Sequence, residues 1–169
     1  FFNRAIGGAY PAGSTIKPFV ASAALAENII DSRSKIDDTL GYIKIENQYD
    51  SSIVYTYRDW KAHGFVDMRR AIAVSANVYF YVIGGGYKNF KGLGIDKIKK
   101  YLNIFGFGSG LGIDLPGEAS GLIPDASWKK SAKNESWFTG DTYNVSIGQG
   151  DVLVTPLQMA SAVAAIANN

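Results

Sequence analysis

The chain has 169 residues, of which 47% are hydrophobic and 19% charged, and its formal net charge is +2. These values suit a folded domain with its own core, exclude a disordered chain, and give no support to a nucleic-acid partner because no basic run is present. The absence of cysteine excludes disulfides and a thiolate nucleophile, and the single histidine gives little support to a histidine-based triad.

The first predicted element is a helix over about residues 14–28, which begins after the turn residue Gly13. Ser14 and Lys17 share one face of this helix because they are three residues apart. A serine is a poor nucleophile until a base takes its proton, and a desolvated lysine can be that base. Ser-x-x-Lys also marks ordinary helix starts, so it leaves the chemistry open. The residues expected to face inward are Ile16, Phe19, Val20, Ala23 and Ala24.

A β-hairpin is predicted next, with strands over residues 42–49 and 53–58 that alternate around a polar turn. Asp59 and His63 follow it and could lend ligands to a metal, but we predict no dedicated metal site and no cofactor. Trp60, between them, is a candidate for the wall of a cleft.

Residues 67–83 read as a helix that is interrupted near Ser75 and ends at three glycines. The interruption carries Ser75-Ala76-Asn77, a Ser-x-Asn triplet. Two polar residues that merely break an apolar helix are the simpler interpretation. Penicillin-recognising serine enzymes, however, combine Ser-x-x-Lys, Ser-x-Asn and Lys-Thr-Gly at one cleft, and the first two occur here in that order.

The second half of the chain has two well-marked helices. The clearest apolar stripe covers residues 95–105 and stops at a glycine-rich segment that lacks dinucleotide-binding spacing. Residues 117–136 are expected to be loop, with a helical turn near residues 125–130. The last helix starts at a capping box, Thr155 to Gln158, with Pro156 at its first position. Its small-residue face, suited to close packing, is Ala160, Val163, Ala164 and Ala167.

Further stretches carry a resemblance to a known family. They are residues 2–5, 11–19, 57–61, 112–118, 144–150 and 153–158. With the two motifs they resemble the transpeptidase domain of class B penicillin-binding proteins, of the penicillin-binding protein 2 type that serves cell elongation. The stretches occur in family order and span nearly the whole chain. Ala62-His63-Gly64 departs from the subfamily, which tends to have glycine before the histidine.

The resemblance implies an α+β fold, the penicillin-binding protein and serine β-lactamase-like transpeptidase fold, in which helices flank an antiparallel sheet. No Lys-Thr-Gly or Lys-Ser-Gly occurs in this chain, and Lys130-Ser131-Ala132 lacks the glycine. We therefore expect residues 1–169 to be a partial transpeptidase domain, truncated at both ends. It would be a mostly helical fragment with a peripheral hairpin, lacking most of the central sheet.

The resemblance also implies a reaction and a location. Ser14 would attack a D-Ala-D-Ala bond of a peptidoglycan stem peptide, Lys17 would accept its proton, Ser75 would relay a proton, and Asn77 would bind substrate. β-Lactams would acylate the same serine, and a membrane glycosyltransferase of the elongation machinery would be a partner. The domain would lie on the periplasmic side of the bacterial inner membrane. Without its third motif, the fragment alone is expected to be inactive.

Two alternatives stay open at this point. A serine β-lactamase or a β-lactam sensor can share the first two motifs, although no residue here can be assigned to activate a deacylating water. A non-catalytic structural fragment is the other alternative.

Overall fold

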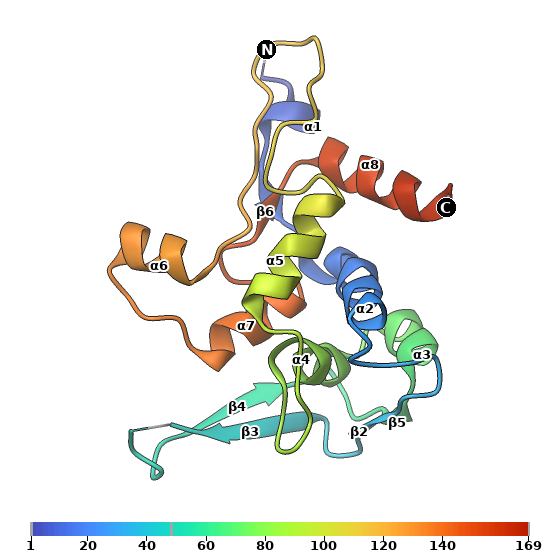
Figure 1. Cartoon of the computed structure of the whole chain (residues 1–169), viewed down its shortest axis with the longest axis vertical. Coiled ribbons are helices and arrows are strands. Elements are labelled where there is room, and N and C mark those ends of the chain that lie inside the picture. The colour runs from blue at the N-terminus through green and yellow to red at the C-terminus, as the bar shows by residue number, and fades with distance from the viewer. Residues whose placement is uncertain (1, 48, 169) are drawn as a thin grey trace.

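The computed structural model describes residues 2–47 and 49–168, and helices make up most of its regular structure (Figure 1). The helices are α1 (Arg4–Gly7), the 3₁₀ helix η1 (Gly13–Ile16), α2 (Lys17–Ala26), α3 (Met68–Ala73), α4 (Asn77–Gly85), α5 (Ile95–Ile104), α6 (Ala126–Lys133), α7 (Thr139–Ser146) and α8 (Pro156–Ala167). The strands are β1 (Tyr10–Pro11), β2 (Ile36–Asp38), β3 (Tyr42–Glu46), β4 (Val54–Arg58), β5 (Gly64–Val66) and β6 (Leu153–Val154).

The strands form small sheets only. Within the described residues β1 pairs with β6, β2 with β5, and β3 with β4, each pair antiparallel. The prediction that helix dominates, with the hairpin of residues 42–58 as the main β element, is confirmed. The short pairs β1–β6 and β2–β5 were not predicted, because two or three residues carry no readable alternation.

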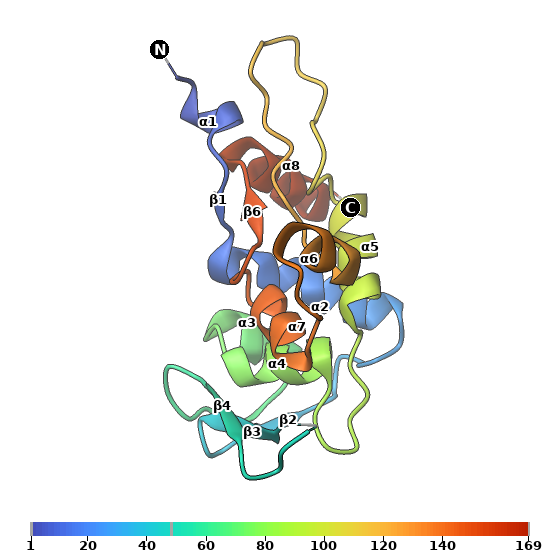
Figure 2. The same cartoon turned by 90° about the vertical axis from the view of Figure 1, so that its left-hand side faces the viewer.

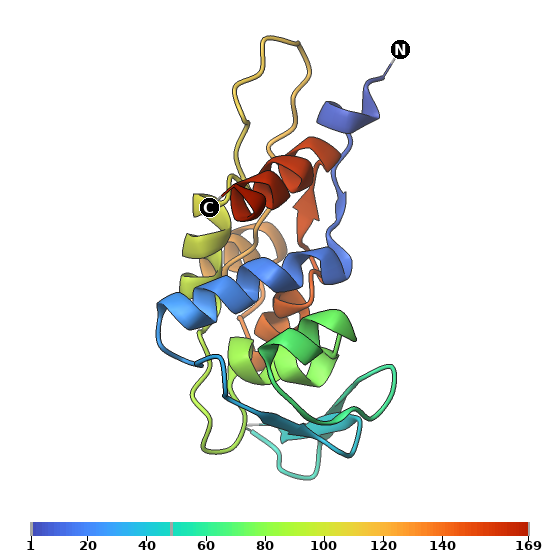
Figure 3. The same cartoon turned by 90° about the vertical axis from the view of Figure 1, so that its right-hand side faces the viewer.

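Helix α4 lies at the centre of the hydrophobic core. Its residues from Val78 to Gly84 are buried, and α2, α3, α5 and α7 pack around it. Figure 3 shows α2 crossing the molecule next to α3 and α4. The five residues predicted to face inward, Ile16 at the end of η1 and Phe19, Val20, Ala23 and Ala24 in α2, are all buried in this core. The predicted break at Ser75 is confirmed, since α3 and α4 are separate helices on either side of it.

Helix α7 was not predicted from the sequence. It begins after Phe138, whose side chain cannot accept a hydrogen bond, and the Asp141 carboxylate instead accepts from the Phe138 N–H at 2.7 Å. Packing then holds it against α4. A Cβ atom on Gly84 would overlap the Ser146 hydroxyl, so the two helices can approach closely only because that residue is glycine. Tertiary packing has overridden weak local propensity here.

The other end of the molecule carries α1, α8 and the β1–β6 pair, which lie side by side in Figure 2. Helix α8 has the predicted capping box at Thr155 and Gln158. Its small-residue face is exposed within the described structure, so the expected close packing is not seen there. Helix α6 is longer than the predicted turn and is capped by the Asp125 carboxylate. Across residues 2–47 and 49–168, the structure contains no helix with the length and apolar content of a membrane span.

Candidate active site

The two residues of the first motif lie where η1 passes into α2. Lys17 is the first residue of α2, and its backbone N–H donates to the Ser14 carbonyl, which closes a 3₁₀ turn. Residues i and i+3 eclipse each other in such a turn, so Ser14 and Lys17 start from one face as predicted. Ser14 is exposed, whereas Lys17 retains only 1% exposure. Gly13, with φ of +55°, donates its N–H to the Gly148 carbonyl at 2.8 Å and so fixes the turn before Ser14.

The Lys17 amine reaches the second motif. Its Nζ donates to Ser75 Oγ at 2.9 Å, to the Ser75 carbonyl at 2.8 Å and to Asn77 Oδ1 at 2.7 Å. The expected proximity of these three residues is therefore observed. No hydrogen bond joins the Ser14 hydroxyl to Lys17 in the described part of the chain, so the amine lies with the second motif while Ser14 stands free at the surface.

Two opposing effects set the protonation of Lys17. Burial lowers the pKa of its ammonium group from the usual 10.5 to about 8, because the charged form loses its hydration, and the negative charge of Asp59 opposes the shift. The three acceptors also match the three N–H donors of an ammonium group. Lys17 is thus a cation that gives up its proton more readily than an exposed lysine does.

The second motif is held by the ends of two helices. Ser75 lies between α3 and α4 with φ of +56°, a left-handed conformation that is uncommon for a residue other than glycine. Asn77 is the first residue of α4. This geometry directs both the carbonyl and the hydroxyl of Ser75 to Lys17, and the contact with the carbonyl is one that the sequence alone does not reveal.

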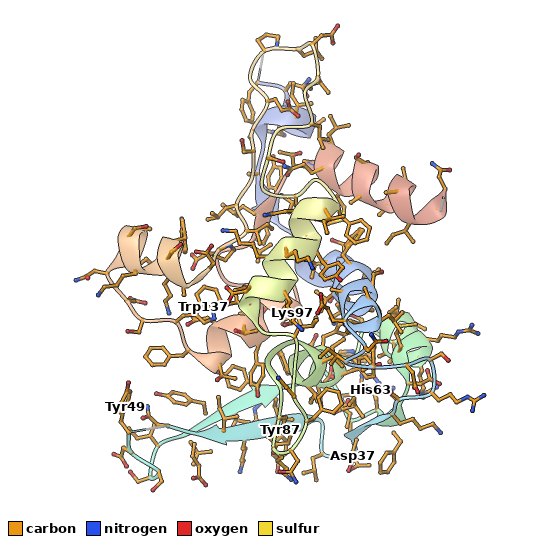
Figure 4. The ribbon with its side chains drawn as sticks, in the orientation of Figure 1. Asp37, Tyr49, His63, Tyr87, Lys97 and Trp137 are labelled. Atoms are coloured by element: carbon orange, nitrogen blue, oxygen red, sulfur yellow. The ribbon has the colours of Figure 1, made fainter. Side chains whose placement is uncertain are left out.

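Behind this junction lies an acidic cluster, defined as Asp38, Asp59 and His63. The ligand atoms of these three side chains lie within 4.8 Å of one another, and His63 Nε2 is 3.7 Å from Asp59 Oδ1. Figure 4 shows His63 between α3 and the β2–β5 pair. Both Asp38 carboxylate oxygens and both His63 ring nitrogens are buried without a hydrogen-bond partner in the described structure. Burial and the neighbouring Asp59 carboxylate raise the pKa of Asp38 to about 7.

One imidazole and two carboxylates suit a divalent cation such as zinc. Asp59 and His63 were the possible ligands in the sequence, and Asp38 is the member that sequence reasoning missed. The antiparallel register places Asp38 opposite Gly64, directly after His63. No local sequence pattern predicts that Asp38 lies next to His63, because their proximity depends on the pairing of β2 with β5.

Residues 1–169 match the penicillin binding protein transpeptidase domain. The chain therefore belongs to the family of penicillin-binding protein transpeptidase domains, and the predicted family and fold class are confirmed. Within this family it is of the PBP2 or MrdA type. It is 42% identical to the peptidoglycan D,D-transpeptidase MrdA of Acinetobacter baumannii, over 99% of this chain and 24% of that protein. With MrdA of Escherichia coli K12 the identity is 36%, over 99% of this chain and 25% of that protein. The chain thus spans about a quarter of the length of these relatives.

Solved structures agree with the fold. The crystal structure of Pseudomonas aeruginosa PBP2 in complex with WCK 5153 superposes with a TM-score of 0.87 at 36% identity, over 99% of this chain and 36% of that one. PBP2 from Helicobacter pylori in complex with MreC superposes with a TM-score of 0.81 at 36% identity, over 94% of this chain and 27% of that one.

Proposed function

We propose that the protein carrying this chain is a peptidoglycan D,D-transpeptidase that cross-links stem peptides through an ester on Ser14. The observation that carries the proposal is the junction of the two motifs. Lys17, buried and with a lowered pKa, binds Ser75 and Asn77 from a separate pair of helices, one 3₁₀ turn from Ser14. An ordinary helix start does not need a buried amine that is shared with a second polar triplet.

The reaction follows from the positions of these groups. Neutral Lys17 takes the Ser14 hydroxyl proton as Ser14 Oγ attacks the carbonyl of the D-Ala-D-Ala bond. The proton passes through Ser75 to the leaving amine, so terminal D-Ala departs and the acyl group stays on Ser14. Asn77 holds a substrate amide. An amine of a second stem peptide then takes the acyl group and restores the serine.

The Ser14 backbone N–H would be one oxyanion donor, and the Gly13–Gly148 contact sets the turn that aims it. A second donor and the anchor for the substrate carboxylate are expected from a Lys-Thr-Gly strand, which this sequence does not contain. Losing one oxyanion donor costs about 10²–10³ in rate, so residues 1–169 alone should be nearly inactive.

Partners and location follow by likeness to relatives. One similar structure is PBP2 with MreC, and another, of a peptidoglycan synthase complex, superposes with a TM-score of 0.79 at 30% identity. We infer that this protein works with such an elongation machinery, including a membrane glycosyltransferase, on the periplasmic side of the inner membrane.

A mass spectrum of the full-length protein after penicillin treatment tests the proposal. We expect a long-lived adduct on the peptide that contains Ser14, lost in Ser14→Ala and kept in the control Ser22→Ala, whose serine lies further along the chain in α2. Rapid turnover of the adduct would instead indicate the β-lactamase alternative. The absence of an adduct would indicate that this part of the protein is structural and non-catalytic, and it would refute the proposed transpeptidase function.

A further inference from the structure

The junction between α3 and α4 is a helix end joined directly to a helix start. The Ser75 N–H donates to the Ile72 carbonyl at 3.2 Å, and the Ala76 N–H donates to the Ala71 carbonyl at 2.9 Å. This pair of bonds is a Schellman ending, in which the left-handed position is usually glycine. Here Ser75 occupies it, at a strain of about 1–2 kcal/mol. A strained serine persists only if its surroundings hold it there.

Each helix has backbone groups at this junction that its own turns do not satisfy. Ala76 precedes α4 as its N-cap, but an alanine side chain cannot accept from the first N–H groups. The Val74 carbonyl at the end of α3 needs a donor as well. Both partners come from one dipeptide after β4. Asp59 Oδ2 accepts from the Val78 N–H at 2.9 Å, and the Trp60 indole N–H donates to the Val74 carbonyl at 3.1 Å.

The dipeptide is itself well fixed. The Asp59 side chain is fully buried, and its Oδ1 accepts from the Trp60 backbone N–H at 2.8 Å. The Trp60 ring packs edge to face with His63, with ring centroids 4.9 Å apart, although 62% of the tryptophan remains exposed. An acceptor for α4 and a donor for α3 are therefore presented side by side from one segment that its own contacts hold in place.

We propose that Asp59 and Trp60 form a positioning clamp for the Ser-x-Asn motif, a role that rests on the proposed function. By holding the start of α4 and the end of α3 together, the clamp keeps Ser75 in its left-handed turn. In that turn the Ser75 carbonyl and hydroxyl supply two of the three acceptors of Lys17. Neither clamp residue touches the reacting atoms. Loosening the Trp60 arm frees the end of α3 and so moves the proton path between Lys17 and Ser75, whereas Asp59 still holds the start of α4 and with it Asn77.

A β-lactam first forms a non-covalent initial complex and then acylates the serine. Measuring the two steps separately distinguishes a change in the proton path from a change in substrate binding. In the full-length protein, Trp60→Phe keeps the ring and removes the indole N–H. We expect the acylation rate constant to fall about three- to tenfold, the range for one lost hydrogen bond, with a dissociation constant for the initial complex that changes less than twofold. Trp128→Phe is the matched control. Its indole N–H makes no hydrogen bond among the described residues, and a lysine lies over its ring as Lys61 does over Trp60. It should react like the unsubstituted protein.

A second pair of variants tests the other arm. Asp59→Asn keeps an acceptor for the Val78 N–H and should lower the acylation rate constant less than about fivefold. Asp59→Ala removes the acceptor and should lower it about 10- to 100-fold. All variants are compared in one chelator-containing buffer, because Asp59 also belongs to the acidic cluster.

The outcomes distinguish the two proposals. Equal rate constants for Trp60→Phe and Trp128→Phe overturn the clamp, as does a loss confined to the dissociation constant, which would make Trp60 a substrate contact. Equal effects of Asp59→Asn and Asp59→Ala also overturn it. If the unsubstituted protein formed no adduct on Ser14, the proposed function itself would fail and the clamp with it.

Discussion

The lowered pKa of Lys17 predicts the pH dependence of acylation. If neutral Lys17 is the base, the rate follows its unprotonated fraction. With a pKa of about 8, that fraction is about 9% at pH 7, 50% at pH 8 and 91% at pH 9. The acylation rate should therefore rise about fivefold from pH 7 to 8, less than twofold from pH 8 to 9, and then level off. A lysine at its usual pKa of 10.5 would instead give about tenfold per pH unit over this whole range.

The assay is the second-order rate of adduct formation on the full-length protein, from pH 6 to 9.5, with a penicillin that has no titrating group in that range. Lys17→Ala should lower the plateau by at least about 10²-fold and remove the rise, because a positioned base is lost. Lys17→Arg should do the same, since a guanidinium stays protonated throughout. A rate that keeps climbing tenfold per pH unit beyond pH 9, or that is already flat at pH 6, would refute the assignment of Lys17 as the base.

Three further predictions concern single residues. Ser14→Ala in the full-length protein should abolish penicillin labelling on a gel while leaving the melting temperature within about 2 °C, because Ser14 is exposed. Gly148→Ala should lower acylation at least about tenfold, since its Cβ would overlap the Gly13 carbonyl. Gly112→Ala, with a similar positive φ but open space around it, is the control, and equal losses would refute the contact. In a chelator-containing buffer above pH 7, Asp38→Asn should raise the free energy of unfolding, measured with denaturant, by at least about 1 kcal/mol. The folded pKa of Asp38 is raised above its unfolded value, so its destabilising effect grows as pH rises from about 4 to 7. An unchanged pH profile of stability would contradict this.

The sequence predicts those elements whose signals are local. Helix α8 starts at its predicted residues because Thr155 and Gln158 form the capping box and Pro156 occupies the first helical position, all within four residues. Helix α7 escapes prediction because its stability comes from packing on α4 and from a cap supplied three residues inside the helix. Strands β2 and β5 also escape prediction, because each is defined by its partner strand and not by a pattern in its own residues.

The candidate site divides in the same way. The spacing of Ser14 and Lys17 is local and could be predicted from helix geometry alone. The bond from Lys17 to the Ser75 carbonyl depends on a positive φ that a non-glycine residue rarely adopts, so no sequence rule anticipates it. Asp38 joins the acidic cluster only through strand register. Long-range pairing, more than residue type, limits what the sequence can tell about such a site.

The contact between Gly13 and Gly148 has a consequence for the order of folding. Helix α2 can form early, because its hydrogen bonds are local and chain synthesis proceeds from the N-terminus. The turn that carries Ser14, however, donates its hydrogen bond, from the Gly13 N–H, to the carbonyl of Gly148 near the other end of the chain. We expect the nucleophile to reach its final position only after α7 and the loop behind it have docked. Partly folded molecules would then contain the whole Ser-x-x-Lys motif and still be unable to react with a penicillin.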